Sequence, residues 1–197
     1  MTEFSGLGQR LKGWLLGGVG AAIAVIVGIG LAILGTKPKP PATLDARQSI
    51  ATGQWLVRPL AAYTAAGAVH GIQLKDGRAL VLEAQLVNRT AETSSDYGTL
   101  FKPETGLDGK RPRPTVVLLR DGVGGRSPGL HPGLGERVAF IWPMAKGQEP
   151  PASLAFVVNS KRYKAMDNLK GLPGWFNEQP AGRFTLAVAP PGRGGVD

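Results

Sequence analysis

The sequence predicts a mainly β sandwich domain carried behind one N-terminal transmembrane helix. Three observations lead to this fold class. An uncharged apolar block runs from Trp14 to Leu34. Gly and Pro residues divide the rest of the 197-residue chain into short pieces, and several of these pieces alternate apolar and polar side chains with a period of two. A chain of this length has room for one such domain, a membrane segment and a linker.

The apolar block has the length of a membrane span. Its 21 residues include eleven Leu, Ile or Val residues and no charged one. At a rise of roughly 1.5 Å per residue they cover about 31 Å, close to the hydrocarbon thickness of a bilayer. We therefore assign a transmembrane helix to residues 14–35, behind an arm of residues 1–13. A cleaved signal peptide is the main alternative, but its apolar region would be shorter and would end in a small-x-small site.

The orientation of the helix is predicted from the length of the arm. Arg10 and Lys12 precede the helix and Lys37 and Lys39 follow it, so the positive charges balance. A short arm favours a cytoplasmic N-terminus, which places the domain outside the plasma membrane.

Small residues recur every four positions along one face of the helix, where they would let a second copy or another membrane subunit approach closely: Gly20, Ala24, Gly28 and Ala32.

A Pro-rich linker is predicted at residues 36–53, a sandwich at residues 54–189 and a disordered tail at residues 190–197. The strongest local pattern is Ile72–Leu82, in which Asp76-Gly77 between alternating apolar runs predicts a hairpin turn. Leu80, Leu82, Ala84 and Leu86 should face the core, while Glu83 and Gln85 face away. Further strands are expected at Gln54–Val57, Tyr97–Phe101, Thr115–Arg120, Arg137–Trp142, Leu154–Asn159 and Phe184–Val188. Alternate residues of the last three strands should face inward: Val138, Phe140, Trp142, Leu154, Phe156, Val158, Phe184, Leu186 and Val188.

Two segments resemble a known type of domain. The run Ala79–Asn88 is similar to the central strand of Ig-like, telokin-like extracytoplasmic modules of bacterial proteins. Leu130–Trp142 is similar to their later segment, in which a Pro-Gly turn precedes a strand that ends in aromatic residues. The resemblance implies an Ig-like antiparallel β-sandwich of about seven strands in the cell envelope. It carries over no activity and no functional residue.

Composition excludes several classes of site. The chain has no Cys, so it has no disulfide, thiolate metal site or cysteine nucleophile. His70 and His131 lack neighbouring ligands at metal-binding spacing, and no catalytic or phosphate-binding motif is present. We expect no catalytic, cofactor or metal residues, no cofactor and no enzymatic activity.

The net charge of +9 suits an anionic envelope polymer or lipid, with Lys110, Arg111 and Arg113 as the densest basic cluster. The same residues are equally consistent with the solvated loops of a basic protein. Nucleic acid is not an expected partner, because no cluster interleaves aromatic residues in a recognised motif.

Trp175 and Phe176 are the most conspicuous candidates for partner contact. They follow Pro173-Gly174, which predicts a loop, where two aromatic side chains could plug the end of the sandwich or anchor a partner.

Taken together, these features of the sequence predict a membrane-anchored extracytoplasmic interaction module that is not an enzyme. The alternative is an accessory subunit of a membrane transport or secretion complex, held through the transmembrane helix.

Overall fold

The computed structural model describes residues 40–104, 113–120, 125–126, 128–145, 147–149, 151–169 and 171–191. The chain divides into two compact units, Met1–Pro40 and Pro41–Asp197. The predicted transmembrane helix with its small-residue face, and the basic residues Lys110 and Arg111, lie outside the described residues. Among the residues that are described, no helix has both the length and the apolar character to cross a membrane.

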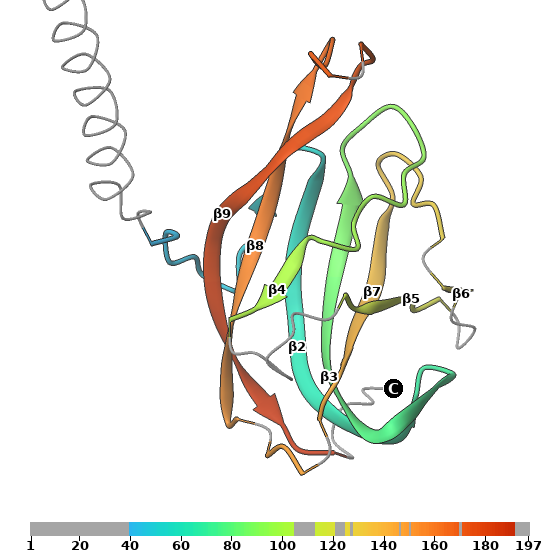
Figure 1. Cartoon of the computed structure of the whole chain (residues 1–197), viewed down its shortest axis with the longest axis vertical. Coiled ribbons are helices and arrows are strands. Elements are labelled where there is room, and N and C mark those ends of the chain that lie inside the picture. Colours follow the sequence, from blue (N-terminus) through green and yellow to red (C-terminus); the bar gives the residue numbers. More distant parts are fainter. Residues whose placement is uncertain are drawn as a thin grey trace, which may run out of the picture. The chain divides into compact units, whose positions relative to one another are not determined.

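The described part of the second unit is a mainly β structure with nine strands: β1 (Ile50–Ala51), β2 (Trp55–Val69), β3 (Ile72–Asn88), β4 (Phe101–Pro103), β5 (Thr115–Leu118), β6 (Gly125–Arg126), β7 (Gly135–Pro143), β8 (Ser153–Lys164) and β9 (Gly174–Ala189). Neighbouring strands follow the order β4-β8-β9-β2-β3-β7-β5-β6, and β1 pairs with β2. The sheet folds on itself into two layers (Figure 1).

The two layers are joined through β2. The long antiparallel pairing of β2 with β3 builds one layer, and β8 pairs antiparallel with β9 in the other. Near its end, β9 runs parallel to β2, with Ala62 opposite Val188 and Tyr63 opposite Ala189. β2 therefore contributes hydrogen bonds to both layers.

The main core lies between the two layers. Phe101 of β4 meets Phe140 of β7 and Phe184 of β9 edge to face, with ring centroids 5.0 and 5.9 Å apart. Such pairs contribute roughly 0.5–1.5 kcal/mol beyond the burial of their area. The predicted inward positions in β3, β7 and β8 are confirmed, because all of them are buried: Leu80, Leu82, Ala84, Leu86, Val138, Phe140, Trp142, Leu154, Phe156 and Val158.

The hairpin predicted at Asp76-Gly77 is wrong. Both arms belong to the single strand β3, and the chain reverses at His70-Gly71 instead. His70 (φ 47°) and Gly71 (φ 76°) both have the positive φ that tight hairpin turns require. Gly77 (φ 84°) lies where the β2–β3 register is irregular, so its conformational freedom serves a bulge within the strand.

The outer face of β3 is buried rather than solvated, which corrects the half-buried strand that we expected. Val81 and Glu83 on this face are 0% and 1% exposed. The side chains of Val69, Ile72 and Leu74, near the turn of the β2–β3 hairpin, pack against a second apolar cluster there, made of Tyr63, Ala65, Ala79, Val81, Val117, Ala139 and Ile141. The hairpin end therefore covers part of this face, which alternation of residue types does not reveal.

A charge network around the buried Glu83 fixes the hairpin end in place. His70 Nε2 lies 2.8 Å from the hydroxyl of Tyr63, although seven residues of straight strand would span about 23 Å. The Tyr63 hydroxyl donates to Glu83 at 2.7 Å, and Arg137 donates to the other carboxylate oxygen. Burial alone would raise the pKa of Glu83, but the hydrogen bonds from His70, Tyr63 and Arg137 outweigh it and lower the pKa from 4.5 to about 2.

The compact unit begins before residue 54. Leu44 N donates to Arg183 O and Arg183 N donates to Ala42 O, while β1 pairs with the start of β2. Part of the segment expected as a linker thus lies against the sandwich. Its backbone groups pair with β9, an interaction between distant segments that a Pro-rich composition does not indicate.

The strand β2 is longer than expected. It continues to Val69, far beyond the expected Val57, through an Ala-rich stretch of low strand propensity.

The Glu83 network makes stability depend on pH. Because the folded-state pKa of Glu83 is depressed, the stabilisation is complete above the unfolded value of 4.5 and is lost as the pH falls toward 2. We expect this one carboxylate to account for up to roughly 3 kcal/mol of the loss in unfolding free energy between about pH 5 and pH 2. Urea unfolding at several pH values should show a flatter profile for Glu83→Gln. Parallel profiles for the two proteins would contradict this role.

Candidate functional site

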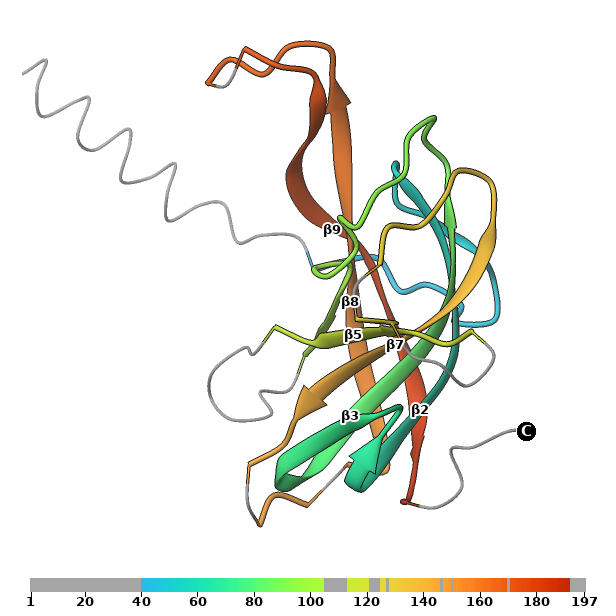
Figure 2. The same ribbon diagram turned by 90° about the vertical axis from the view of Figure 1, so that its right-hand side faces the viewer.

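The β8–β9 hairpin extends beyond the other strands of the sandwich (Figures 1 and 2). Its outer part pairs Arg162 with Phe176, Tyr163 with Trp175 and Lys164 with Gly174. Trp175 and Phe176 therefore lie in β9 rather than in the loop that Pro173-Gly174 suggested. The strand forms there because β8 continues to Lys164 and supplies the pairing partners, which the local sequence of β9 does not indicate.

The turn of this hairpin is fixed around Asp167. The carboxylate of Asp167 accepts hydrogen bonds from the amide of Leu169 and from Lys164, while its backbone pairs with Gly171 and Leu172. Asp167 is only 7% exposed. A turn with this many internal hydrogen bonds presents its other side chains in a defined arrangement.

Three apolar side chains project from the turn. Met166, Leu169 and Leu172 are 70%, 95% and 62% exposed. Leaving such a side chain in water forgoes roughly 1.5–3 kcal/mol of burial free energy. We call these three residues the apolar tip. Its exposure on an ordered, projecting turn is typical of a contact surface for a partner.

A groove lies beside the hairpin, between its inner side and the segment Thr90–Asp96. Its volume is about 520 Å³, within the range of pockets that hold ligands. Tyr163 and Trp175 form an aromatic corner on one side, with ring centroids 5.6 Å apart and planes at 61°. The described residues that line the groove are Gln54, Thr90, Ala91, Glu92, Thr93, Ser94, Asp96, Tyr163, Pro173, Gly174 and Trp175.

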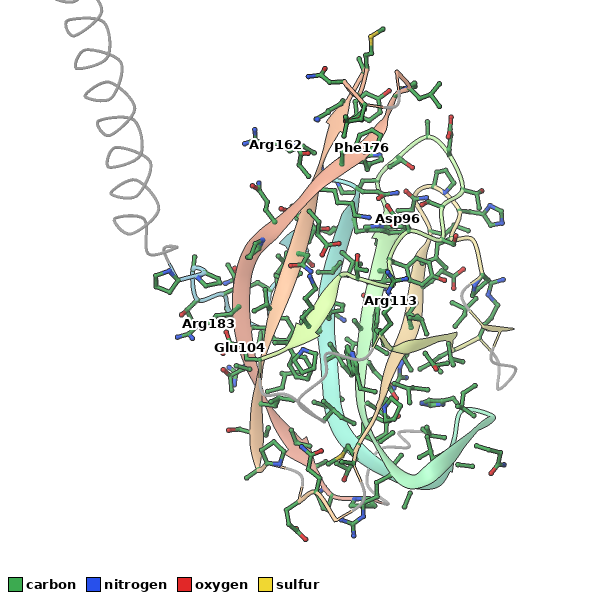
Figure 3. All side chains as sticks on the ribbon, viewed as in Figure 1. Asp96, Glu104, Arg113, Arg162, Phe176 and Arg183 are labelled. Atoms are coloured by element: carbon green, nitrogen blue, oxygen red, sulfur yellow. The ribbon has the colours of Figure 1, made fainter. Side chains whose placement is uncertain are left out.

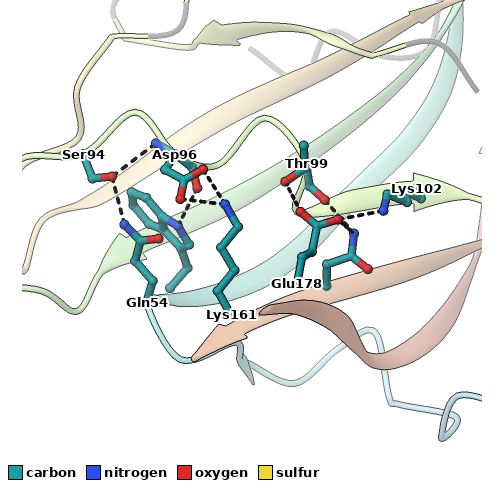
Figure 4. Close-up of polar contacts among 9 residues, drawn as sticks. Gln54, Ser94, Asp96, Thr99, Lys102, Lys161 and Glu178 are labelled. Atoms are coloured by element: carbon teal, nitrogen blue, oxygen red, sulfur yellow. Dashed lines mark hydrogen bonds and ion pairs between the residues drawn. The ribbon is translucent and has the colours of Figure 1, made fainter. Parts of the chain in front are cut away.

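Hydrogen bonds from the start of β2 and from β8 hold the far wall of the groove in place (Figure 4). Lys161 Nζ lies 2.6 Å from both carboxylate oxygens of Asp96. The indole N–H of Trp55 donates to the Asp96 carbonyl at 3.1 Å, and Gln54 Nε2 donates to Ser94 Oγ at 2.9 Å. Three separate side chains thus fix a loop that has little regular structure of its own.

A second polar cluster continues this attachment toward β4 (Figure 4). Glu178 accepts hydrogen bonds from Thr99, Lys102 and Asn159 at 2.5, 2.7 and 3.1 Å. Burial alone would raise the pKa of Glu178, but hydrogen bonds from Lys102 and Thr99 and the nearby positive charges lower it. The carboxylate therefore stays ionised at neutral pH and ties the hairpin to the segment before β4.

One buried acceptor at the groove has no hydrogen bond. Gln54 is 4% exposed, and its Oε1 is a buried side-chain atom without a partner among the described residues. An unpaired buried carbonyl of this kind costs about 1–3 kcal/mol. Gln54 is one of the residues that line the groove.

The predicted partner-contact residues do not form one patch. Phe176 lies on the projecting hairpin, whereas Arg113 lies apart from it, near the start of β5 (Figure 3). The ring of Phe176 has Lys164 Nζ 5.8 Å from its centroid. The groove has no Lys or Arg among its described lining residues but has two carboxylates, Glu92 and Asp96. Its chemistry therefore differs from the basic surface that the net charge suggested.

Within the described part of the chain, no three His, Asp or Glu residues are arranged to hold a metal ion. The buried Glu83 already accepts hydrogen bonds from Tyr63 and Arg137, and its pKa of about 2 leaves it little basicity at neutral pH. Burial and the hydrogen bond to Glu83 raise the pKa of Tyr63. His131 contacts Thr93 at 2.9 Å, on the loop that borders the groove. These groups are engaged in interactions that support the fold.

Gly53 allows Trp175 to pack at the groove, and its replacement tests this packing. A Cβ atom at Gly53 (φ +79°) would lie 3.0 Å from the Trp175 ring and in collision with the Lys161 carbonyl. We expect Gly53→Ala to lower the unfolding free energy by about 2–4 kcal/mol. Gly67→Ala is the matched control, because Gly67 (φ +72°) has nothing within 4 Å of its Cβ position, and should cost about 1 kcal/mol. Equal losses in urea unfolding would contradict the close approach.

Comparison with known proteins identifies no family for this chain. No protein-family model matches the chain, and no curated protein does. A solved structure of an uncharacterized β-sandwich protein from Clostridium difficile 630 is similar, with 11% sequence identity and a TM-score of 0.49 over 77% of this chain and 97% of that chain. The two-layered β structure of this chain resembles that uncharacterized bacterial β-sandwich protein.

Proposed function

We propose that this protein is a membrane-anchored, extracytoplasmic interaction module of the bacterial cell envelope, without enzymatic activity. The observation that carries the proposal is the apolar tip of Met166, Leu169 and Leu172 on an ordered, projecting turn. Association with a partner would bury these three neighbouring side chains and gain their burial free energy, which supports a binding surface at this turn.

We further propose that the sandwich is Ig-like. Seven of its strands support this assignment, because β2-β3-β7-β5 and β4-β8-β9 follow the order of strands ABED and CFG in constant-type Ig domains. β1 and β6, with two residues each, are additions to that plan. Ig-like domains commonly bind through loops and turns at the ends of the sandwich, which is where the apolar tip and the groove are found.

The membrane anchor is the part of the proposal that rests on the sequence. The 21-residue apolar block of Trp14–Leu34 has the length of a transmembrane helix. If its N-terminus is cytoplasmic, the tip and the groove face the envelope. Partners would then be envelope proteins or other subunits in the same membrane.

Fractionation tests the anchor and its orientation. Full-length protein should stay in the membrane pellet after carbonate washing, because a span of this apolar content is held by the bilayer interior. Added protease should digest the domain in spheroplasts and spare it in inside-out vesicles. Release into the soluble fraction, or digestion only in inside-out vesicles, would contradict this placement.

Photo-crosslinking tests the apolar tip. We expect benzoylphenylalanine in place of Leu169 to give a discrete crosslinked protein in intact cells, because Leu169 is the most exposed residue of the tip. Arg58, an exposed position in β2, is the control site for incidental encounters. The crosslink should fall at least about tenfold when Met166 and Leu172 are both changed to Ser, since each lost apolar contact is worth roughly 1–2 kcal/mol. Identical adducts from Leu169 and Arg58 would refute the tip as a contact surface.

A further inference from the structure

We propose that the groove between Thr90–Asp96 and the β8–β9 hairpin binds an Arg or Lys side chain of the protein partner. This inference rests on the proposed role as an interaction module and adds the chemistry by which the partner is recognised. Four features of the groove support it: its aromatic corner, its charge, its unpaired acceptor and its place beside the apolar tip.

The aromatic corner offers faces on which a cation can lie. Tyr163 is 58% exposed and Trp175 is half-buried, and their rings stand at 61° to each other. A cation within about 6 Å of such a ring is attracted by its quadrupole, most strongly over Trp. The same hairpin already uses this interaction, since Lys164 Nζ lies 5.8 Å from the centroid of Phe176.

The charge of the groove selects a cation over an anion. Its described lining contains Glu92 and Asp96 and no basic residue. Lys161 neutralises Asp96, whereas Glu92 has no ion-pair partner within the part of the chain that the structure describes. A chain with a net charge of +9 thus has a groove whose described lining includes both an unpaired carboxylate and an aromatic corner. Charge complementarity favours a positively charged side chain at this site.

Two side chains in the lining of the groove carry acceptors for which the described residues supply no donor. Gln54 Oε1 is buried without a partner among the described residues, and the carboxylate of Glu92 accepts only. An Arg guanidinium carries five N–H donors and a Lys ammonium carries three, and neither accepts a hydrogen bond. Either group therefore brings donors and no acceptor, which is complementary to these two side chains.

The apolar tip indicates that the cation belongs to a protein. Leu172 of the tip directly precedes Pro173, which lines the groove. A partner that covers the tip therefore lies next to the groove and can place a side chain in it. A free polyamine would use the groove alone and would leave the tip in water.

Calorimetric titration of the full-length protein in detergent tests the assignment. The probes are acetyl-Gly-Arg-Gly-Arg-Gly-amide and its citrulline analogue, which keeps the shape of the side chain and removes the charge. We expect the Arg peptide to bind at least about tenfold more tightly than the citrulline peptide. Trp175→Leu and Glu92→Gln should each weaken binding by at least about threefold. Trp175→Phe keeps a weaker aromatic face and should bind with an affinity between those of the parent and Trp175→Leu. Glu149→Gln removes an exposed carboxylate outside the groove and should bind as the parent does.

Three results would overturn the inference. They are equal affinity for the two peptides, no heat of binding by the Arg peptide at about 10 mM, and binding of spermidine as tight as that of the Arg peptide. Circular dichroism melts of each variant separate loss of binding from loss of folding. The titration involves neither the anchor nor the apolar tip. Failed titration with intact crosslinking at Leu169 would therefore reject the groove assignment and leave the proposed function standing.

Discussion

The shared pairing of β2 is the constraint on which the rest of the structure depends. β2 forms the long hairpin with β3, and its middle residues pair in parallel with the end of β9. Without that second pairing, the β4-β8-β9 layer would lose its strand-to-strand pairing with the other layer. The start of the same strand supports the site, since Trp55 and the preceding Gln54 hold the Thr90–Asp96 segment by hydrogen bonds. Fold and groove thus depend on one element.

The polar side chains discussed above fall into two groups: one group stabilises the fold, and the other lines the groove. Glu83 and Glu178 are surrounded by donors that lower their pKa values, and each joins segments that are distant in the sequence. Glu92 and Gln54, by contrast, present acceptors without matching donors in the described structure. The first pair stabilises the hairpin ends and the attachment of the groove wall. The second pair, with Tyr163 and Trp175, gives the groove its preference for a cationic side chain.

Alternating residue types were sufficient to predict the mainly β class and the inward residues of β3, β7 and β8. This succeeded because burial against a single core imposes a period of two on a strand. The turn at His70-Gly71 was missed because Asp76-Gly77 is the stronger local signal, while the long β2–β3 pairing decides where the chain reverses. Trp175 was recognised as conspicuous, yet the groove was not predicted. Its other wall, near Glu92, lies some eighty positions earlier in the sequence, and only the tertiary fold brings the two together.

The parallel pairing of β2 with β9 is open to a direct measurement, because the chain has no Cys of its own. Ala62 and Val188 are opposite each other in this pairing, and both pack in or against the main core. Cys residues at both positions should form an intramolecular disulfide under mild oxidation of the folded protein, and the oxidised form should unfold at a higher temperature than the reduced form. If the two thiols stay reduced until the protein is unfolded, the two layers are not joined through β2 and the account is wrong.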